Sequence, residues 1–371
     1  MKRYLEKYIK HDIKSKIVII SGPRQVGKTT LAKMIENDYE YLNYDFPEHR
    51  LIIHRRSWNR KKKMIIFDEI HKMKEWKNFL KGIYDVEGLH NKIIVTGSFR
   101  LRRLKKQGDS LAGRFFEFRL FPVDIFETKN ENDFEKLLKV SGFPEPFLKN
   151  KENFYKRWRR SHYDIILRKD LLETEKVSDI PSIELLSEIL REKVGSLISY
   201  SNLSGDLEKS PTTVKRWLEI LENLYLIFKI TPYHRNIARS ILKAPKYYFF
   251  DTAIVKGGMG AKVENMVALS LYKYLAFLED KKGYETSLHF LRNKEKKEID
   301  FYVKVEENEY LIEVKAKDNK KSKNFEIFKK YFPNAKSIQL VLELRNEEIY
   351  PDGTEIRDLK KWLKNIDSEL K

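Results

Sequence analysis

The chain has 371 residues, of which 41% are hydrophobic and 35% are charged, and its formal net charge is +19. This length allows two or three domains, and the apolar content excludes an intrinsically disordered chain. The chain has no apolar run of membrane-spanning length, no cysteine, and no hydrophobic signal segment at its start. We therefore expect a cytoplasmic protein without a membrane partner, and its positive charge favours a polyanionic partner, DNA first.

A complete phosphate-binding loop of the pattern G-x-x-x-x-G-K-T lies within residues 21–30, SGPRQVGKTT. An apolar run precedes it and a helical pattern follows, which is the strand–loop–helix order that this motif requires. The Lys28 ammonium would reach the β- and γ-phosphates, and the Thr29 hydroxyl would bind Mg²⁺. We expect ATP and Mg²⁺ as ligands, with the nucleotide held by Gly22, Pro23, Arg24, Gln25, Val26, Gly27, Lys28, Thr29 and Thr30.

An apolar strand predicted at residues 64–67 ends in two acidic residues, Asp68 and Glu69. Asp68 would hold Mg²⁺, directly or through water. Glu69 would polarise the water that attacks the γ-phosphate. The alternative for Glu69 is an acid that caps the following helix.

Two more predicted strands carry candidate catalytic residues. The strand at residues 92–95 leads into Thr96 and Ser98, either of which would sense the γ-phosphate or orient water, unless the segment is only a turn. The strand at residues 115–120 follows Arg114. A guanidinium at this place can reach the γ-phosphate of a neighbouring subunit, so Arg114 is a candidate arginine finger in trans.

Six motifs follow one another along the N-terminal part of the chain: GPRQVGKTT from residue 22, YLNYD from 41, FDEIH from 67, TGS from 96, LAGR from 111 and FPVDIFE from 121. Together they resemble the archaeal and bacterial AAA+-like P-loop ATPases of the AAA_14 type, which carry a C-terminal DUF4143-type domain. The resemblance spans nearly the whole chain and implies ATP hydrolysis in a homo-oligomer, a ring. One departure is FRLRR from residue 99, where such proteins carry small serine-rich residues, so the family's reading of that loop does not transfer.

Residues 196–250 are predicted to form a winged-helix-like module. A short helix at 201–207 is followed by a second helix that begins after the N-cap Ser210, and strands at 227–231 and 246–250 flank a basic loop. The alternative is a module that only packs or oligomerises. Basic residues in this module and in the segment FRLRR from residue 99 are expected to contact DNA. They are Lys215, Arg216, Arg235, Arg239, Arg100, Arg102 and Arg103.

The C-terminal part contains a nuclease-like pattern. A β-hairpin with its turn near residues 307–308 would place position 300 opposite position 315. The side chains expected to meet there are Asp300, Glu313 and Lys315, with Glu264 as a further metal ligand. This is the pattern of restriction-endonuclease-like folds. An active nuclease, an inactive nuclease-like DNA-binding fold and a coincidental pattern on a similar fold remain equal alternatives.

The predicted fold class is α/β, in four parts. An AAA+-like P-loop NTPase core with a parallel sheet spans residues 1–140, and a helical lid or linker spans 141–195. A winged-helix module follows at 196–250, and a mixed α/β restriction-endonuclease-like domain at 251–371. The favoured function is Mg²⁺-dependent ATP hydrolysis coupled to DNA remodelling. An ATP-regulated, metal-dependent DNA nuclease and an ATP-switched protein scaffold without DNA activity are the alternatives.

Overall fold

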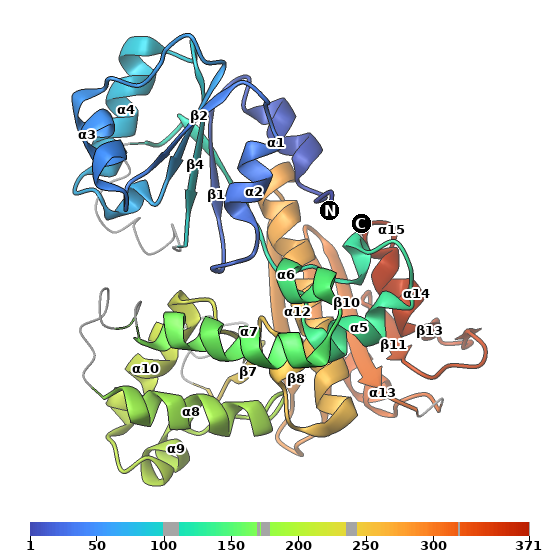
Figure 1. The fold of residues 1–371 in the computed structure, drawn as a ribbon. Helices are drawn as coiled ribbons and strands as arrows, with labels where there is room; N and C mark the ends of the chain where they lie inside the picture. Colours follow the sequence, from blue (N-terminus) through green and yellow to red (C-terminus); the bar gives the residue numbers. More distant parts are fainter. Residues whose placement is uncertain (99–110, 169–170, 172–178, 235–242, 318–319, 371) are drawn as a thin grey trace. The chain divides into compact units, whose positions relative to one another are not determined.

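The computed structural model describes residues 1–98, 111–168, 171, 179–234, 243–317 and 320–370 (Figure 1). The chain divides into two units, and each is described by itself. Unit 1 comprises residues 1–121 and 280–282, and unit 2 comprises residues 122–279 and 283–371. Among the described helices, none combines the length and the apolar content that crossing a membrane requires.

Unit 1 is built on a five-stranded sheet in which all strands are parallel, in the order β2-β3-β4-β1-β5. This confirms the predicted parallel α/β sheet of a P-loop NTPase. Its strands are β1 (Ile17–Ser21), β2 (Tyr39–Asn43), β3 (Met64–Asp68), β4 (Lys92–Gly97) and β5 (Phe115–Arg119). Its helices are α1 (Glu6–Asp12), α2 (Lys28–Lys33), α3 (Pro47–Arg55) and α4 (Trp76–Glu87).

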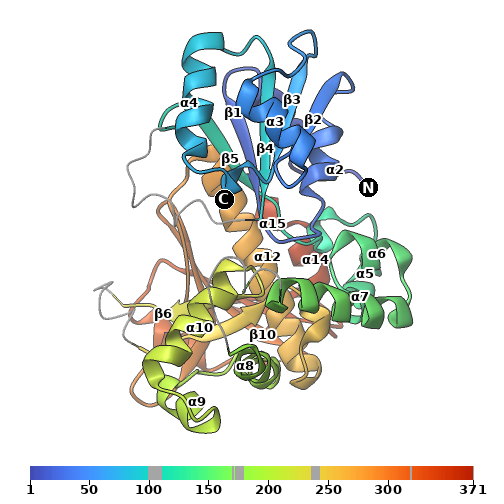
Figure 2. The ribbon, with the colours of Figure 1, turned by 60° about the vertical axis from the view of Figure 1, so that its left-hand side comes forward.

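The central strands of this sheet are buried because helices cover both faces. Every residue of β1 and β3 is buried, which agrees with their almost uninterrupted apolar sequence. On one face, α3 and α4 close a core in which the rings of Trp58, Phe67 and Phe79 meet edge to face. The helices α1 and α2 lie on the other face (Figures 1 and 2). The rigid sheet fixes the positions of the loops that follow its strands.

Unit 2 contains an eight-stranded mixed sheet in the order β12-β13-β11-β10-β9-β8-β6-β7. Its strands are β6 (Ile227–Pro232), β7 (Lys246–Phe249), β8 (Thr286–Arg292), β9 (Glu298–Val305), β10 (Asn308–Lys315), β11 (Lys336–Val341), β12 (Glu348–Ile349) and β13 (Glu355–Asp358). The hairpin β6–β7 joins the rest of the sheet through parallel pairing of β6 with β8. The predicted wing and the predicted C-terminal domain therefore share one sheet.

Helices surround this second sheet. They are α5 (Asp133–Val140), α6 (Pro144–Lys149), α7 (Glu152–Asp164), α8 (Ile180–Glu192), α9 (Tyr200–Asp206), α10 (Pro211–Asn223), α12 (Gly258–Lys282), α13 (Asn324–Lys329), α14 (Leu359–Lys364) and α15 (Ile366–Glu369). Ser210 caps α10 by accepting a hydrogen bond from the Thr213 N–H at 3.1 Å, as its sequence predicts. The amide of Asn265 in α12 bonds both the N–H and the C=O of Phe249 (2.7 and 2.9 Å), which fixes the end of β7 to this helix.

The hairpin β9–β10 has a different register from the predicted one. Val305 pairs with Asn308 across a two-residue turn, and Phe301 pairs with Ile312. This register brings position 300 opposite position 313, so the predicted pairing of 300 with 315 is wrong. The turn is centred one residue earlier than predicted, which moves the partner of each residue by two positions. Since side chains alternate with a period of two, the predicted residues remain on one face of the sheet.

Candidate functional site

The phosphate-binding loop connects β1 to α2 and needs glycine at both glycine positions of its motif. Gly22 has φ 143°, and a Cβ atom there would lie 2.1 Å from the carbonyl oxygen of Leu120. Gly27 immediately precedes α2 with φ 94°. Both angles are unfavourable for a residue with a side chain. The backbone conformation of the loop therefore requires these two glycines, in addition to any contact that they make with phosphate.

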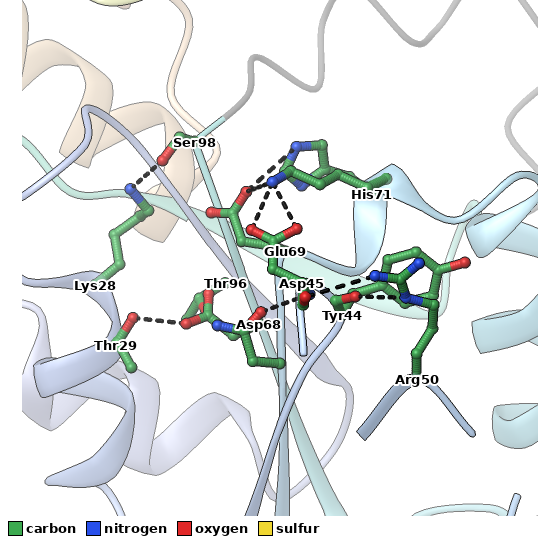
Figure 3. Close-up of polar contacts among 12 residues, drawn as sticks. Lys28, Thr29, Tyr44, Asp45, Arg50, Asp68, Glu69, His71, Thr96 and Ser98 are labelled. Atoms are coloured by element: carbon green, nitrogen blue, oxygen red, sulfur yellow. Dashed lines mark hydrogen bonds and ion pairs between the residues drawn. The ribbon is translucent and has the colours of Figure 1, made fainter. Parts of the chain in front are cut away.

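Lys28 folds back onto the loop that it follows. Its buried ammonium donates hydrogen bonds to the carbonyl oxygens of Gly22 (2.9 Å) and Pro23 (2.6 Å) and to the Ser98 hydroxyl (3.0 Å) (Figure 3). Ser98 follows β4, the neighbour of β1 in the sheet. The structure thus brings the predicted phosphate-binding lysine together with one of the two predicted sensor residues.

Asp68, the last residue of β3, accepts hydrogen bonds from three hydroxyl groups. Thr29 and Tyr41 donate to Oδ2 at 3.0 and 2.7 Å, and Thr96 donates to Oδ1 at 2.5 Å. The second predicted sensor, Thr96, therefore orients the carboxylate, while Ser98 contacts the lysine. Burial and the nearby Asp68 charge raise the pKa of the Tyr41 hydroxyl, which keeps it a hydrogen-bond donor at neutral pH.

Tyr41 was not among the predicted site residues. It lies on β2, which pairs with β3 so that Asn43 is opposite Asp68. The only signal in the sequence is the YLNYD motif, which assigns no role to the tyrosine. Its contact with Asp68 depends on the order of strands in the sheet.

Glu69 follows Asp68 directly, but its carboxylate lies in different surroundings. Its backbone has φ 56°, and its N–H donates to the Thr96 carbonyl at 2.9 Å. The carboxylate oxygen Oε2 is buried and accepts no hydrogen bond within the described part of the chain. Burial raises the pKa of this carboxyl, and the positive charges of Lys28, Arg24 and Lys72 oppose that rise.

The alternative role of Glu69 as a helix cap is not what the geometry shows. Glu69 precedes a short 3₁₀ turn, Ile70–Lys72, but its side chain makes no capping hydrogen bond there. Its Oε2 atom lies 3.7 Å from His71 Nε2 and 3.8 Å from Lys72 Nζ. Burial lowers the pKa of His71 to about 4, so this imidazole is neutral at pH 7. Lys72 in turn bonds Asp45 at 2.6 Å, at the end of the YLNYD motif.

The side chains at this edge of the sheet fit a nucleotide with Mg²⁺. The Thr29 hydroxyl and the Asp68 carboxylate are oxygen donors 3.0 Å apart, and such oxygens are the ligands that Mg²⁺ takes in proteins. The Lys28 ammonium donates hydrogen bonds to two carbonyl oxygens, and phosphate oxygens could take their place as acceptors. The Oε2 atom of Glu69 is a buried acceptor to which no described residue donates a hydrogen bond.

Arg114 lies at the opposite edge of the sheet from the phosphate-binding loop of its own chain. Its carbonyl accepts from the N–H of Ile17, the first residue of β1, whereas the loop follows the last residue of that strand. Its guanidinium donates two hydrogen bonds to Asp85, at 2.6 and 3.0 Å. A role as a finger within one chain is therefore excluded by position, and the role in trans stays a prediction.

The residues expected to contact DNA are only partly described. Lys215 and Arg216 lie exposed on α10. The other predicted positions, Arg100, Arg102, Arg103, Arg235 and Arg239, fall outside the described residues.

The predicted nuclease-like residues cluster around a buried lysine from β7, Lys246. Its ammonium lies 2.5 Å from a Glu298 carboxylate oxygen and 3.5 Å from one of Glu264. Burial and the nearby Asp300 charge raise the pKa of Glu264 to about 7. The Asp300 carboxylate accepts from the backbone N–H of Val314 at 2.8 Å.

The other half of this cluster lies on β10. Glu313 is buried, and its carboxylate accepts from Asn324 at 2.9 Å and lies 3.5 Å from the Lys315 ammonium. No three His, Cys, Asp or Glu side chains in the described chain are arranged to hold a metal ion. The Lys246 ammonium already lies between two of the acidic groups. Among the described residues, these acidic side chains therefore form no three-ligand metal group, and nuclease activity stays a prediction.

Comparison with protein-family models divides the chain into three consecutive segments. Residues 14–129 match an AAA domain of the AAA_14 type, residues 131–262 match a domain of unknown function (DUF8612), and residues 259–362 match a second domain of unknown function (DUF4143). The AAA match covers all five strands of the unit 1 sheet. The DUF8612 match begins after that sheet and continues into α12.

Curated relatives are similar along most of the chain and come from both bacteria and archaea. An uncharacterized protein of Methanocaldococcus jannaschii is 27% identical over 371 residues, covering 88% of this chain and 80% of its own. An uncharacterized protein of Haemophilus influenzae is 23% identical over 403 residues, covering 97% of both chains. One of Mycobacterium tuberculosis is 22% identical over 317 residues, covering 81% of this chain and 70% of its own.

Among solved structures, the comparison finds a STAND (signal transduction ATPase with numerous domains) protein with a tetratricopeptide-repeat sensor from Pyrococcus horikoshii. It is 15% identical and covers 76% of this chain, which spans about half, 52%, of that one. The TM-score is 0.24, so this likeness adds nothing to the fold described above. The sheet order and the AAA match together give the conclusion: the chain carries an AAA-type P-loop ATPase domain joined to a C-terminal DUF4143 domain.

Proposed function

We propose that this protein hydrolyses ATP with Mg²⁺ at the phosphate-binding loop and couples hydrolysis to work on DNA. One observation carries the first part. Lys28, Thr29, Asp68, Glu69 and Ser98 come from three segments of the chain and meet where β1, β3 and β4 end. Each has the chemical group that phosphoryl transfer to water requires.

Each residue of the site would have a separate role in ATP hydrolysis. When bound, Mg²⁺ would neutralise charge that develops on the phosphate oxygens, and Thr29 and Asp68 would hold it. Lys28 would exchange its bonds to the Gly22 and Pro23 carbonyls for phosphate oxygens. Glu69 would accept a hydrogen bond from the attacking water and orient it. The nearby Lys28, Arg24 and Lys72 favour the ionised carboxylate that this task needs.

The proposed DNA role rests on charge. The chain has a net charge of +19, and Lys215 and Arg216 stand exposed near the beginning of a capped helix that follows a short helix and a turn. A hairpin, β6–β7, follows that helix. This order of elements supports a winged-helix-like module that presents α10 to DNA.

We also propose a homo-oligomer. Arg114 lies at the edge of the sheet away from the phosphate-binding loop of its own chain. Its guanidinium could therefore contact only a γ-phosphate that is bound to a neighbouring copy. The ion pair with Asp85 would have to open for that contact. Arg114→Ala would then lower hydrolysis, and mixing it with a Glu69→Gln chain would restore part of the activity, because the mixed interfaces contain one complete site.

The decisive experiment measures phosphate release from ATP in the presence of Mg²⁺ with no DNA, duplex DNA, single-stranded DNA and branched DNA. Stimulation by at least one DNA form is expected, and the Lys215→Glu, Arg216→Glu double variant should lose affinity for that form in a mobility-shift titration. Hydrolysis that no DNA form changes would contradict the coupling to DNA. Unchanged affinity of the double variant would exclude α10 as the recognition helix.

A further inference from the structure

The helix α7 of unit 2 carries a row of basic side chains that the sequence analysis did not single out. Its buried side consists of Tyr155, Trp158 and His162. The rings of Trp158 and His162 stack with centroids 4.5 Å apart, and both contact Phe143. This packing fixes how α7 is rotated about its axis. The basic side chains therefore stand on the outer side, at positions 156, 157, 159 and 160.

Two adjoining hollows lie beside these basic side chains, with volumes of about 510 Å³ and 540 Å³. The first lies between α7 and α8, and the second follows the outer side of α7. Arg160, Asp164 and Arg168 line both hollows, so the two form one continuous surface. Lys156, Arg159 and Arg191 complete the cations of the first hollow, and Arg157 adds a cation to the second. We call these six cations the α7 basic surface: Lys156, Arg157, Arg159, Arg160, Arg168 and Arg191.

Most of the positive charge on the α7 basic surface has no close acidic partner among the residues that the structure describes. Lys156, Arg157 and Arg160 make no hydrogen bond or ion pair with any described residue. Arg168 approaches Asp164 and Glu184 only at 3.8 and 3.9 Å.

One of the three acidic residues that line the first hollow, Glu188, is already paired with two cations. Glu188 is bonded by Arg191 and, at 2.7 Å, by Lys256. In the second hollow, three arginines face a single acid, Asp164. Uncompensated guanidinium groups attract an anion and lose little hydration when they bind one.

The spacing of these groups suits a chain of phosphates. Residues three or four apart on a helix are neighbours on its surface, with Cβ atoms about 5–6 Å apart, so their long side chains can reach phosphates of the same strand. Arg157 and Arg160 are three apart, and Arg168 continues the same side beyond the end of α7. Most of the surface is arginine, whose planar fork bonds a phosphate through two N–H groups at once.

Building on the proposed DNA role, we infer that the α7 basic surface binds the sugar–phosphate backbone of DNA without regard to sequence. Arg157, Arg160 and Arg168 contact phosphates of one strand. The hollow between α7 and α8 takes one phosphate group with its sugar, since its volume is that of a site for a small ligand. This contact is separate from base reading by α10 and supplies the part of the affinity that depends on salt.

The test is a fluorescence-anisotropy titration of the full chain with labelled DNA duplexes of two unrelated sequences, over a series of salt concentrations. The test variant is Arg157→Gln with Arg160→Gln. The matched control is Lys294→Gln with Lys297→Gln, which removes the same charge from exposed positions in the turn between β8 and β9. Circular dichroism and thermal unfolding verify that both variants fold.

The test variant should bind both duplexes roughly ten- to hundredfold more weakly at 0.1 M salt, and its log–log salt slope should fall by about 2 because two phosphate contacts are lost. The control should stay within about twofold of the unaltered chain, since it keeps those contacts. ATP hydrolysis without DNA should not change in either variant.

Three results would overturn this inference. The test variant could bind like the unaltered chain, the control could weaken binding as much, or polyglutamate of equal charge could compete as well as DNA. If the unaltered chain binds DNA but the test variant is unaffected, only the α7 assignment fails. If the unaltered chain binds no DNA form at all, the proposed DNA role fails with it.

Discussion

Asp68 and Glu69 are neighbours in the chain, yet their carboxylates have opposite surroundings. Three hydroxyl groups hold Asp68 in one orientation, so it is suited to position a cation. The Oε2 atom of Glu69 is buried and accepts no hydrogen bond from the described residues, so it is suited to accept one from water. The left-handed backbone at Glu69 turns the second side chain away from the first. Two acids in sequence thus acquire two roles from their local environment.

Replacing Glu69 by Gln should abolish hydrolysis and stabilise the fold. Loss of the group that orients water should lower the rate of phosphate release by about 10²–10³-fold. The folded pKa of Glu69 is raised above its unfolded value of 4.5, so its ionisation costs folding free energy at pH values above the raised pKa and costs nothing below about 4.5. Glu69→Gln should therefore raise the unfolding temperature at pH 7.5, and this gain should shrink as the pH falls towards 4.5.

Thermal unfolding followed by circular dichroism at several pH values measures the effect on stability. The rate of phosphate release measures the loss of hydrolysis. Tyr39→Phe serves as a folding control because Tyr39 lies on β2, away from both carboxylates. A Glu69→Gln chain that hydrolyses ATP at the normal rate, or that is less stable at pH 7.5, would contradict the role given to this residue.

Replacing Tyr41 by Phe should weaken the response to Mg²⁺. The variant loses the 2.7 Å hydrogen bond to Asp68 but keeps the ring. A hydrogen bond to a charged group contributes roughly 1.5–3 kcal/mol, and part of it should appear as a three- to tenfold higher Mg²⁺ concentration at half-maximal rate. Tyr39→Phe on the same strand is the matched control and should leave the Mg²⁺ dependence unchanged. Equal behaviour of the two variants would show that Tyr41 does not position Asp68.

The sequence predicts those site residues whose contacts are local. The phosphate-binding loop and the pair Asp68-Glu69 follow from short motifs at strand ends, and the structure places them together. Tyr41 and Lys246 could not be predicted in this way. Tyr41 contacts Asp68 from the neighbouring strand β2, and Lys246 of β7 contacts Glu298 of β9 and Glu264 of α12. Both contacts depend on the tertiary arrangement and not on a local motif.

At the scale of elements, β7 is held to the rest of unit 2 by polar contacts that are almost entirely buried. Lys246 bonds Glu298 and approaches Glu264, and Tyr248 donates to Glu264 at 2.8 Å. Asn265 bonds the backbone of Phe249 at both polar atoms. The strand that was predicted as the edge of a wing is therefore a fixed part of the core around α12.

Replacing Lys246 by Met should destabilise unit 2 strongly. The variant keeps the apolar stem but leaves two carboxylates, each about one-fifth exposed, without their buried cation. Removing one partner of a fully buried ion pair costs roughly 3–5 kcal/mol, and this is the upper limit for the present pair. Adding Glu298→Gln should recover part of the loss. Lys229→Met on β6 is the matched control, because its ion pair with Glu222 is exposed on the lysine side and should contribute no more than about 1 kcal/mol.

Urea unfolding of the single and double variants gives these free energies. If Lys246→Met were as stable as Lys229→Met, the buried lysine would not be compensating the acidic cluster. If adding Glu298→Gln recovered none of the lost free energy of unfolding, the effect of Lys246 would not come from its ion pair with Glu298.

The positions of the helices and strands were largely predictable from the sequence. The pairing between strands was less predictable. The capping residue Ser210 and the apolar positions of α10 fixed that helix from local sequence. The predicted register of β9 and β10 was wrong by two positions because the turn is centred one residue earlier than predicted. The turn residues, Glu306 and Glu307, carry no Gly or Asn that would mark its centre.

At the scale of the whole chain, the order of parts was predictable, but the unity of the second sheet was not. The parallel pairing of β6 with β8 joins segments on either side of α12. The predicted boundary between residues 250 and 251 therefore falls between strands of one sheet. Pairing between strands so far apart in sequence leaves no local signal, since it depends on the connection that packs α12 against them.

The central claim is that the phosphate-binding loop of this chain hydrolyses ATP with Mg²⁺. The most direct measurement is phosphate release from ATP by the unaltered chain, with Mg²⁺ and with a chelator, beside Lys28→Ala and the exposed control Lys14→Ala. We predict release that requires Mg²⁺, falls on the order of a hundredfold or more in Lys28→Ala, and is unchanged in Lys14→Ala. Release that is equal in Lys28→Ala and the unaltered chain, or no Mg²⁺-dependent release at all, would contradict the account.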